Sequence, residues 1–574
     1  MSHTQFSQFK LNQLTVGFLW LVLVVVSLLS RSYLPIDETR YVTVAWNMYL
    51  NHDYLVPYLN GETYSHKPPL LFWLMNLGWQ VFGVNDWWPR LVPSFFALGA
   101  VLITQKIAMR LWPTQEQTPH IAALILLGSG MWAVFTTATM FDMLVAFFTV
   151  LGAWGLLLAW QGQANQGQAN QGQANQDQIR QGWTYVVLAI AGGLLAKGPT
   201  ILLQILPLAV LAPWWMGQAS QQDAKKPNLK KPNLKNWYGA LLLSVLLGAL
   251  ILLAWAIPAG IVGGPKYQHD IFWGQTADRM VKSFAHRRPI YWYLPMLPVI
   301  LFPWLFALPV WRSLANIKDY MQETGVRFCL AWFLPVFIAF SLISGKQPHY
   351  LLPIVPAFAL LAARGWTSLS DVKWFDKLLP ALVGMVIGAG LLYLPTYHQH
   401  HYLAVWVLNI PSWAGIAMIL GSVVLMLGIK NKQQYLQRVT LLGVWAILVL
   451  YLGVIRVAGS AYDVTKISQH LKQLQDQNIP LANIGKYHGQ FNFLGRMTKS
   501  PDQLAESQLD AWFETHPNGR VIMYFDKTRP LGDLVPEYAQ PYRALVAGVL
   551  TQTQWQTWAK QPHVPLAVES DGNE

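Results

Sequence analysis

The sequence predicts an α-helical polytopic membrane protein, with about thirteen transmembrane helices and a small α/β domain at the C-terminal end. Hydrophobic residues make up 53% of the 574 residues and charged residues only 12%, a balance unlike that of soluble globular proteins. Thirteen apolar runs are long enough to cross about 30 Å of hydrocarbon as helices. Past residue 459 these runs give way to amphipathic and strand-like patterns.

The first apolar run is expected to be a membrane helix and not a cleaved signal peptide. It follows Lys10, lacks a small-residue cleavage pattern before Arg31, and is followed by many comparable runs. The thirteen predicted helices cover 14–34, 90–110, 120–138, 141–160, 183–196, 198–216, 237–260, 290–311, 328–344, 350–364, 378–395, 411–429 and 440–458.

The net charge of +13 sits largely in short loops between apolar runs, so the positive-inside rule explains it and nucleic acid is not an expected partner. A cytoplasmic N-terminus places most loop cations inside. The segments 35–89, 261–289, 345–349 and everything after 459 then face the periplasm. The cations expected inside are Lys225, Lys226, Lys230, Lys231, Lys235, Arg312, Lys318, Lys430, Lys432 and Arg438.

Two domains are expected: a membrane domain over 1–458 and a periplasmic α/β domain over 459–574. Polar low-complexity repeats mark cytoplasmic linkers at 161–182 and 217–236. In the second domain, 464–475 has the pattern of an amphipathic helix, and 481–487, 521–525 and 543–550 have that of strands. The single cysteine, Cys329, excludes an intramolecular disulfide and a cluster of thiolate metal ligands.

The first periplasmic loop contains two groups of polar and aromatic residues. The stretch Leu-Pro-Ile-Asp-Glu-Thr-Arg-Tyr supplies Asp37, Glu38, Arg40 and Tyr41. The stretch from 59 to 73 supplies Tyr64, His66 and Lys67 beside a Pro-Pro turn. Simpler roles are open, because either acidic residue can cap a helix that starts near 39, and the lysine can extend to a lipid phosphate.

Ionisable residues also occur at the ends of later apolar runs. Asp142 lies between two such runs, where a carboxylate is costly unless it is paired or faces water. Lys197 ends a run in Ala-Lys-Gly-Pro, where it either reaches a head-group phosphate or merely terminates the helix. Lys346 and Tyr350 lie together in a polar break at 344–353.

The second periplasmic loop is rich in cations, which opposes the positive-inside rule and suggests a phosphate partner. Its last residues include His286, Arg287 and Arg288. Contact with lipid head groups is the alternative for each arginine.

These motifs occur in an order that resembles the bacterial lipid A aminoarabinose transferases, within the wider protein O-mannosyltransferase-like superfamily of the GT-C fold. The matching stretches, from about residue 30 to about 365, are Asp-Glu-x-Arg-Tyr, His-Lys-Pro-Pro-Leu, Pro-Arg-Leu-x-Pro, an Asp opening the fourth helix, Ala-Lys-Gly and Lys-x-Pro-x-Tyr-x-Leu-Pro. The resemblance implies a sugar donor on undecaprenyl phosphate and a lipid A phosphate as acceptor, both at the periplasmic face of the inner membrane.

The resemblance also implies roles for particular residues. Asp37 resembles the first-loop carboxylate, Lys67 the lysine of Lys-Pro-Pro, Asp142 the second carboxylate and Tyr350 a cavity tyrosine. Asp37, Asp142 and Lys67 are therefore the catalytic candidates. The candidates for binding substrate phosphate are Arg40, Lys197, Arg287, Arg288 and Lys346, and those for lining the cavity are Glu38, Tyr41, Tyr64 and Tyr350.

A divalent metal ion is an open question, because the family commonly has Glu where this chain has His66. That glutamate contributes to a metal site in the family, whereas here His66 and His286 offer nitrogen ligands instead. Two other functions also stay open. One is transfer to a different envelope acceptor or to a protein, and the other is transport of a lipid-linked glycan, although no internal duplication typical of transporters is visible.

Overall fold

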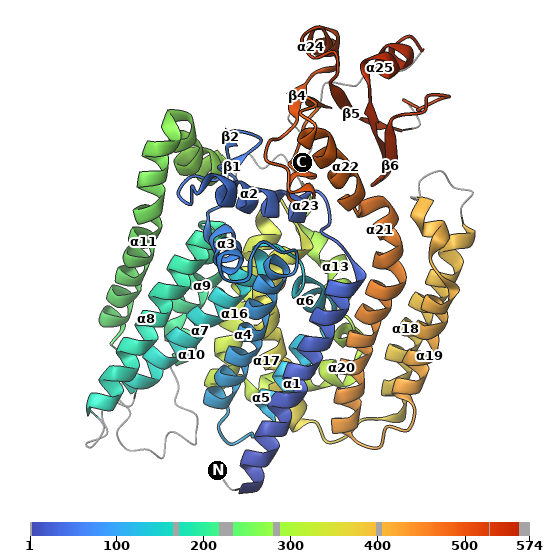
Figure 1. Ribbon diagram of the computed structural model, residues 1–574. Helices are drawn as coiled ribbons and strands as arrows, with labels where there is room; N and C mark the ends of the chain where they lie inside the picture. The colour runs from blue at the N-terminus through green and yellow to red at the C-terminus, as the bar shows by residue number, and fades with distance from the viewer. Residues whose placement is uncertain are drawn as a thin grey trace.

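The computed structural model describes residues 3–164, 172–216, 233–278, 287–397, 405–526 and 529–561. In Figure 1 these residues form a helical bundle with a mixed sheet at one end, and the N-terminus lies at the other end. Nine helical stretches in the described residues are long and apolar enough to cross a membrane, so the chain is a multi-pass membrane protein. These stretches are Asn12–Ser30, Trp88–Leu111, Asp142–Ala164, Gln173–Lys197, Leu234–Gly274, Thr324–Leu342, Pro348–Ser368, Trp374–Thr396 and Lys432–Asp476.

All thirteen predicted runs contain helix, but four of them contain shorter helices than a full crossing needs. The run 120–138 is divided between α5 (Thr118–Leu127) and α6 (Gly130–Phe135), and 290–311 between α13 (Tyr293–Ile300) and α14 (Leu308–Ala315). Prolines, which lack a backbone N–H, interrupt the second of these runs. The other two are 198–216, with α9 (Thr200–Val210) and α10 (Ala212–Met216), and 411–429, with α19 (Ser412–Met426). Thirteen crossings therefore stay a prediction.

Helices α7 (Asp142–Ala164) and α8 (Gly172–Lys197) form a closely packed antiparallel hairpin. A methyl group added at Gly155 would lie 2.6 Å from the carbonyl oxygen of Gly182, and one added at Gly182 would lie 2.5 Å from the nitrogen of Ala159. Small residues of this kind let helix backbones approach in a membrane. The hairpin brings the first residue of α7 and the last residue of α8 to the same end of the bundle.

The segment 35–89, predicted as a loop, consists largely of helices with one short strand pair. It contains α2 (Asp37–Asn51), the strand pair β1 (Tyr58–Leu59) and β2 (Glu62–Thr63), and α3 (Leu70–Phe82). Figure 1 shows α2 lying across the end of the bundle nearest the sheet. The loop rests on α11 (Leu234–His269), where the Trp255 indole donates a hydrogen bond of 2.9 Å to the carbonyl of Leu55.

The remaining helices of the bundle enclose an aromatic core that includes Trp132, Trp304 and Trp332, all fully buried. Arg90 donates a 2.6 Å hydrogen bond to the carbonyl of Ser27 and so satisfies a carbonyl at the end of the first helix. The helices that enclose this aromatic core are α1 (His3–Ser30), α4 (Trp88–Leu111), α16 (Thr324–Leu342), α17 (Val355–Ser368), α18 (Leu378–Tyr393), α20 (Lys432–Val449) and α21 (Arg456–Tyr462).

The C-terminal region, residues 465–559, is a five-stranded mixed sheet with helices on both faces. The strand order is β4-β3-β5-β7-β6, with β4, β3 and β5 parallel and β7 antiparallel to both of its neighbours. Helix α22 (Thr465–Asp476) packs in a core with Ile467 and Leu471, whereas α24 (Leu509–Thr515) and α25 (Gln552–Ala559) form a second core with Trp512 and Trp558. The strands are β3 (Leu481–Ile484), β4 (Asp502–Leu504), β5 (Arg520–Phe525), β6 (Tyr538–Tyr542) and β7 (Leu545–Leu550).

The sequence predictions for this region are confirmed for α22, β3, β5 and β7. The sequence did not predict strands β4 and β6. Strand β4 has only three residues, which are mostly exposed, and strand β6 contains Pro541. The helical run before the region continues to Tyr462, past the predicted domain boundary at 458, and the division into two domains stays a prediction.

Candidate functional site

A buried ion pair lies where α7 begins and α8 ends. Lys197 Nζ lies 2.6 Å from Asp142 Oδ1, and the two side chains are 16% and 5% exposed. Gly198, with a φ of 68°, ends α8 directly after the lysine and lets the chain turn into α9. The N-terminus of α7 favours the carboxylate at its first position. Ionised residues in an apolar bundle mark functional sites by default, and this pair is the centre of the candidate site.

Two aromatic rings from the segment Pro348–Ile354 enclose the ion pair. Lys197 Nζ lies 4.7 Å from the centre of the Tyr350 ring, which adds a cation–π contact. His349 Nε2 lies 3.8 Å from Asp142 Oδ1, and its ring packs between Phe135 and Tyr350 at centroid distances of 5.2 and 4.9 Å. The sequence analysis named Tyr350 but missed His349. Its only signal was its position beside that tyrosine, since the approach to Asp142 depends on the fold.

The first loop brings two more of the predicted residues into the electrostatic field of this pair. Lys67 is half-buried in the turn before α3, and its charge acts on both Asp142 and His349. Asp37, at the start of α2, acts on Lys197 and is itself paired with Arg40 at 2.5 Å. The structure thus places residues from the first loop, α7, α8 and the segment before α17 at one end of the bundle.

Buried aromatic side chains line the contact between the first loop and α7. The Tyr41 ring packs edge-on against Phe141, the residue before Asp142, at 5.0 Å, and Tyr64 packs against Phe72 at 6.2 Å. Both tyrosines are at most 5% exposed. Burial raises the pKa of Tyr41 well above its ordinary value, so its hydroxyl remains a neutral hydrogen-bond donor. These rings therefore pack the first loop against the residue that precedes Asp142.

Glu38 was expected to line the cavity, but the structure places it in a structural ion pair with Arg31. The closest distance between the two side chains is 2.5 Å, and both are 4% exposed. Glu38 also accepts hydrogen bonds from the backbone N–H groups of Leu34 and Thr139, at 2.8 and 2.6 Å. Burial opposes ionisation, yet Arg31 and these hydrogen bonds lower the pKa of Glu38 below its ordinary value. Glu38 therefore positions the loop and does not face a substrate cavity.

The predicted cations of the second loop belong to a separate pair of segments. Arg287 and Arg288 are exposed, and their backbone pairs with Gly345 and Ser344. Lys346 is 2% exposed, and its Nζ donates to the carbonyl oxygens of Arg288 and Ile343 at 3.0 and 2.5 Å. Burial lowers the pKa of Lys346. Its ammonium group holds backbone carbonyls here, so of these three described residues the two arginines, and not Lys346, present exposed charge.

The open question of a metal ion concerns His66 and His286. His66 is exposed, with its ring 5.2 Å from that of Tyr64, and His286 lies outside the described residues. Among the residues that the structure describes, no group of three His, Cys, Asp or Glu side chains is arranged to hold a metal ion. The described donors thus do not fit a metal site, and no step of the chemistry is assigned to a metal.

Known proteins resemble this chain in sequence. The family model described as dolichyl-phosphate-mannose-protein mannosyltransferase matches residues 15–265. Curated relatives named as undecaprenyl phosphate-alpha-4-amino-4-deoxy-L-arabinose arabinosyl transferases are 27% identical in Pseudomonas fluorescens, 28% in Erwinia tasmaniensis and 29% in a Pseudomonas aeruginosa strain. The alignments cover 61–67% of this chain and span only 59–66% of the length of these relatives.

Solved structures extend the likeness to nearly the whole chain. ArnT from Cupriavidus metallidurans in the apo state has a TM-score of 0.71 at 18% identity, and the match covers 96% of this chain and 99% of the other. The same protein bound to undecaprenyl phosphate gives a TM-score of 0.72 at 19% identity, with the same coverage. The oligosaccharyltransferase of Archaeoglobus fulgidus has a TM-score of 0.51 at 11% identity. This match covers 88% of this chain and 69% of the archaeal chain. The chain is thus similar in sequence to these transferases, and it shares the fold of ArnT over nearly its whole length.

Proposed function

We propose that this protein is an integral-membrane glycosyltransferase that transfers a sugar from a polyprenyl phosphate donor to an acceptor at the membrane surface. The observation that carries the proposal is the Lys197–Asp142 pair, a fixed cation within an apolar bundle beside Tyr350 and Lys67. No nucleotide sugar is needed, which agrees with a sequence that lacks a Gly-rich phosphate loop joined to a strand and a helix.

The finer proposal is that the sugar is 4-amino-4-deoxy-L-arabinose, the lipid undecaprenyl phosphate and the acceptor a lipid A phosphate. Two findings support it: the names of the curated relatives, and the solved ArnT structure bound to undecaprenyl phosphate. The order of motifs in the sequence points the same way, from the first-loop Asp37 to Tyr350.

The proposed reaction depends on stabilising the negative charge of the departing phosphate more than on proton transfer. An oxygen of the acceptor phosphate forms a bond to the anomeric carbon, and the bond from that carbon to the donor phosphate oxygen breaks. The electron pair of the broken bond stays on the departing undecaprenyl phosphate. Fixed cations in a dry site stabilise such developing charge, and Lys67, Lys197 and Arg40 are our candidates for this role.

We propose the inner membrane as the location, with the site facing the periplasm. The basic residues Lys430, Lys432 and Arg438 lie around the start of α20, at the end of the bundle opposite the sheet in Figure 1. The positive-inside rule assigns that end to the cytoplasm. The sheet, α2 and Asp142 then lie on the periplasmic side.

The test is a transfer assay with the purified full-length protein, undecaprenyl phosphate-linked aminoarabinose and lipid A in detergent, without any gradient. Mass spectrometry should show lipid A gaining one aminopentose with the wild type and not with Asp142→Asn. Asp533→Asn, at an exposed carboxylate of the C-terminal region, is the matched control and should retain activity. Absence of any transfer would contradict the enzyme proposal and favour a transporter.

A second acceptor class has its own support. The match to the protein mannosyltransferase model over residues 15–265 favours a protein or sugar hydroxyl as acceptor. A hydroxyl must lose its proton, so this alternative requires a base, and the half-exposed Asp37 is the candidate. Unchanged lipid A together with a modified glycan or protein in the same assay would support it.

A further inference from the structure

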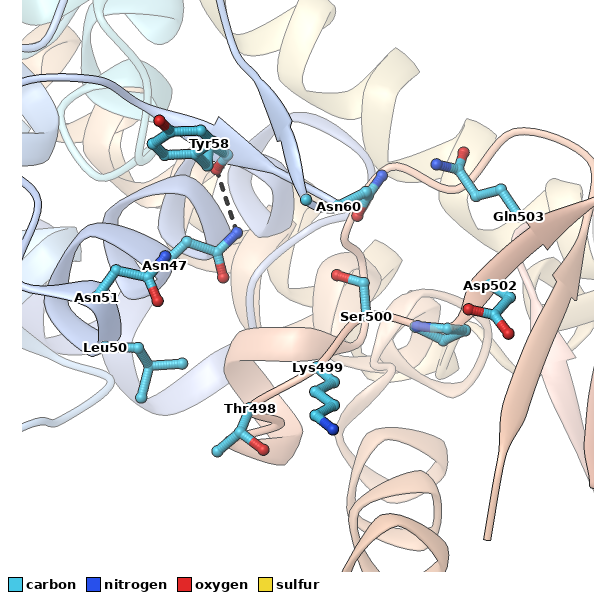
Figure 2. A pocket seen from close by; sticks show the side chains of 12 residues that line it. Asn47, Leu50, Asn51, Tyr58, Asn60, Thr498, Lys499, Ser500, Asp502 and Gln503 are labelled. Carbon is cyan, nitrogen blue, oxygen red and sulfur yellow. Dashed lines mark hydrogen bonds between the residues drawn. The ribbon is translucent and has the colours of Figure 1, made fainter. Parts of the chain in front are cut away.

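A cavity lies between the first loop and the C-terminal region, and neither Lys197 nor Asp142 lines it. Its volume is about 540 Å³, within the range of about 300–1,000 Å³ that is usual for small-molecule sites. Figure 2 shows its two walls, one from α2 and the β1–β2 turn and the other from the segment before and within β4. The residues that line it are Asn47, Leu50, Asn51, Tyr58, Asn60, Gly61, Thr498, Lys499, Ser500, Pro501, Asp502 and Gln503.

The lining is polar but nearly neutral. Four carboxamides line the cavity, from Asn47, Asn51, Asn60 and Gln503, and a carboxamide both donates and accepts hydrogen bonds. Three of them already make one hydrogen bond each within the protein, to the carbonyls of Tyr58 and Tyr487 and from the N–H of Tyr487, and each carboxamide has further hydrogen-bonding capacity. The lining carries one cation, Lys499, and one carboxylate, Asp502, so its formal charges balance. This composition suits neighbouring hydroxyl groups of a sugar better than it suits a phosphate or an acyl chain.

The two walls are held together by direct contacts, so the cavity is preformed. Thr43 Oγ1 donates to the carbonyl of Gly489 at 2.7 Å, and the Trp46 indole donates to the carbonyl of Met497 at 2.9 Å. Arg496 lies 2.6 Å from Asp86. Preorganised walls reduce the cost of ordering on binding.

Helix α2 connects the cavity to the reaction site. Asp37 is its first residue, and Asn47 and Asn51 lie near and at its end. At a rise of about 1.5 Å per residue, the two asparagines are about 15 and 21 Å along the axis from Asp37. The cavity is therefore too far away to hold the reacting group, but a large acceptor can occupy both sites at once.

We infer that this cavity is a subsite for uncharged sugar units of the acceptor that lie beyond the reacting phosphate. The inference rests on the proposed function, since it extends the same acceptor. Binding there is equally strong before and during the reaction. It should therefore lower the KM for the acceptor and leave kcat unchanged.

The test compares two acceptors, lipid A that carries its core oligosaccharide and lipid A stripped of those sugars. Asn51→Ala/Lys499→Ala and the space-filling Asn51→Trp alter exposed residues and should leave the fold intact. Both should raise the KM for the core-bearing acceptor about tenfold, with kcat and the KM for the stripped acceptor unchanged. The control is Gln556→Ala, an exposed amide elsewhere in the C-terminal region. An equal effect on both acceptors, or no effect on either, overturns the inference.

A binding measurement separates this inference from the proposed function. Saturation-transfer NMR with the water-soluble core oligosaccharide, freed of lipid, needs no catalysis. Signal with the wild-type protein that disappears in Asn51→Trp supports the subsite even if no transfer is detected. Equal signal from both proteins overturns the subsite even if transfer is detected.

Discussion

Glu38 and Arg31 form a buried ion pair that joins the first loop to the chain just before the catalytic candidate Asp142. Glu38 accepts a hydrogen bond from the N–H of Thr139, and Arg31 donates to the carbonyl of Thr137, at 2.6 and 2.7 Å. The position of the loop and that of α7 are thus coupled through one charged contact.

Replacing Glu38 by Gln should destabilise the protein by about 3–5 kcal/mol, because it leaves the buried Arg31 without its counter-charge. Thermal unfolding of the purified protein in detergent measures this loss. Glu62→Gln removes an exposed carboxylate from the same loop and should change the unfolding temperature little. Equal unfolding temperatures for the two variants would contradict a structural role for the pair.

The same pair should make stability depend on pH. The pKa of Glu38 is lower in the folded state than its ordinary value, although burial opposes the shift, because Arg31 and backbone N–H groups favour the carboxylate. Its contribution is therefore fully present above the ordinary carboxyl range and is lost as the pH falls through the lowered pKa. The stability difference between the wild type and Glu38→Gln should shrink as the pH falls below the ordinary carboxyl pKa of about 4.5. A constant difference over that range would exclude this linkage.

Lys197→Met should lower kcat by about 10²–10³-fold, because it removes a fixed cation from the proposed leaving phosphate. Initial rates at saturating donor measure the effect. The matched control is Lys266→Met, which removes an exposed lysine from α11 and should stay near wild-type activity. Retained kcat in Lys197→Met would show that the Lys197–Asp142 pair only stabilises the fold.

Asp37→Asn should lower activity without changing the shape of the pH–rate profile if the acceptor is a phosphate. An ionised phosphate needs no base, so Asp37 then only orients Arg40, its partner at 2.5 Å. Steady-state rates across the acidic pH range test this prediction. Loss of an acidic limb in the variant would instead identify Asp37 as the base for a hydroxyl acceptor.

Gly489→Ala should loosen the contact between the C-terminal region and α2. Gly489 has a φ of 71°, and an added methyl group would lie 2.8 Å from atoms of Thr43 and Leu59. Gly485→Ala is the matched control, since its φ is 77° but the added methyl meets nothing within 4 Å. Both variants carry backbone strain of about 1 kcal/mol, and only the first adds a steric clash. Limited proteolysis should cleave Gly489→Ala faster, and equal rates would contradict the proposed close approach.

The sequence predicted the membrane class, the helical segments and much of the C-terminal sheet, because hydrophobic periodicity determines these features locally. It also singled out Asp142 and Lys197, since ionisable residues at the ends of apolar runs are costly without a function, whereas the resemblance to a known family pointed to Asp37, Lys67 and Tyr350. The structure brings these residues to one end of the bundle.

The remaining features depend on contacts between distant segments. Glu38 and Asp37 are neighbours in one motif, yet only the pairing with Arg31 and Thr139 removes Glu38 from the candidate site. The sequence predicted Lys346 to be a phosphate ligand, but in the structure its ammonium group donates a hydrogen bond to the carbonyl of Arg288. Patterns within a single segment do not show which of two polar neighbours will face the interior.

The contact between α2 and the C-terminal region also has a consequence for biosynthesis. Helix α2 is made early, yet Thr43 and Trp46 on it are held by the carbonyl groups of Gly489 and Met497, which emerge from the ribosome hundreds of residues later. Asp37 and Arg40 therefore reach their final positions only when translation is nearly complete. A chain that stops before this region would lack both of these hydrogen bonds to α2.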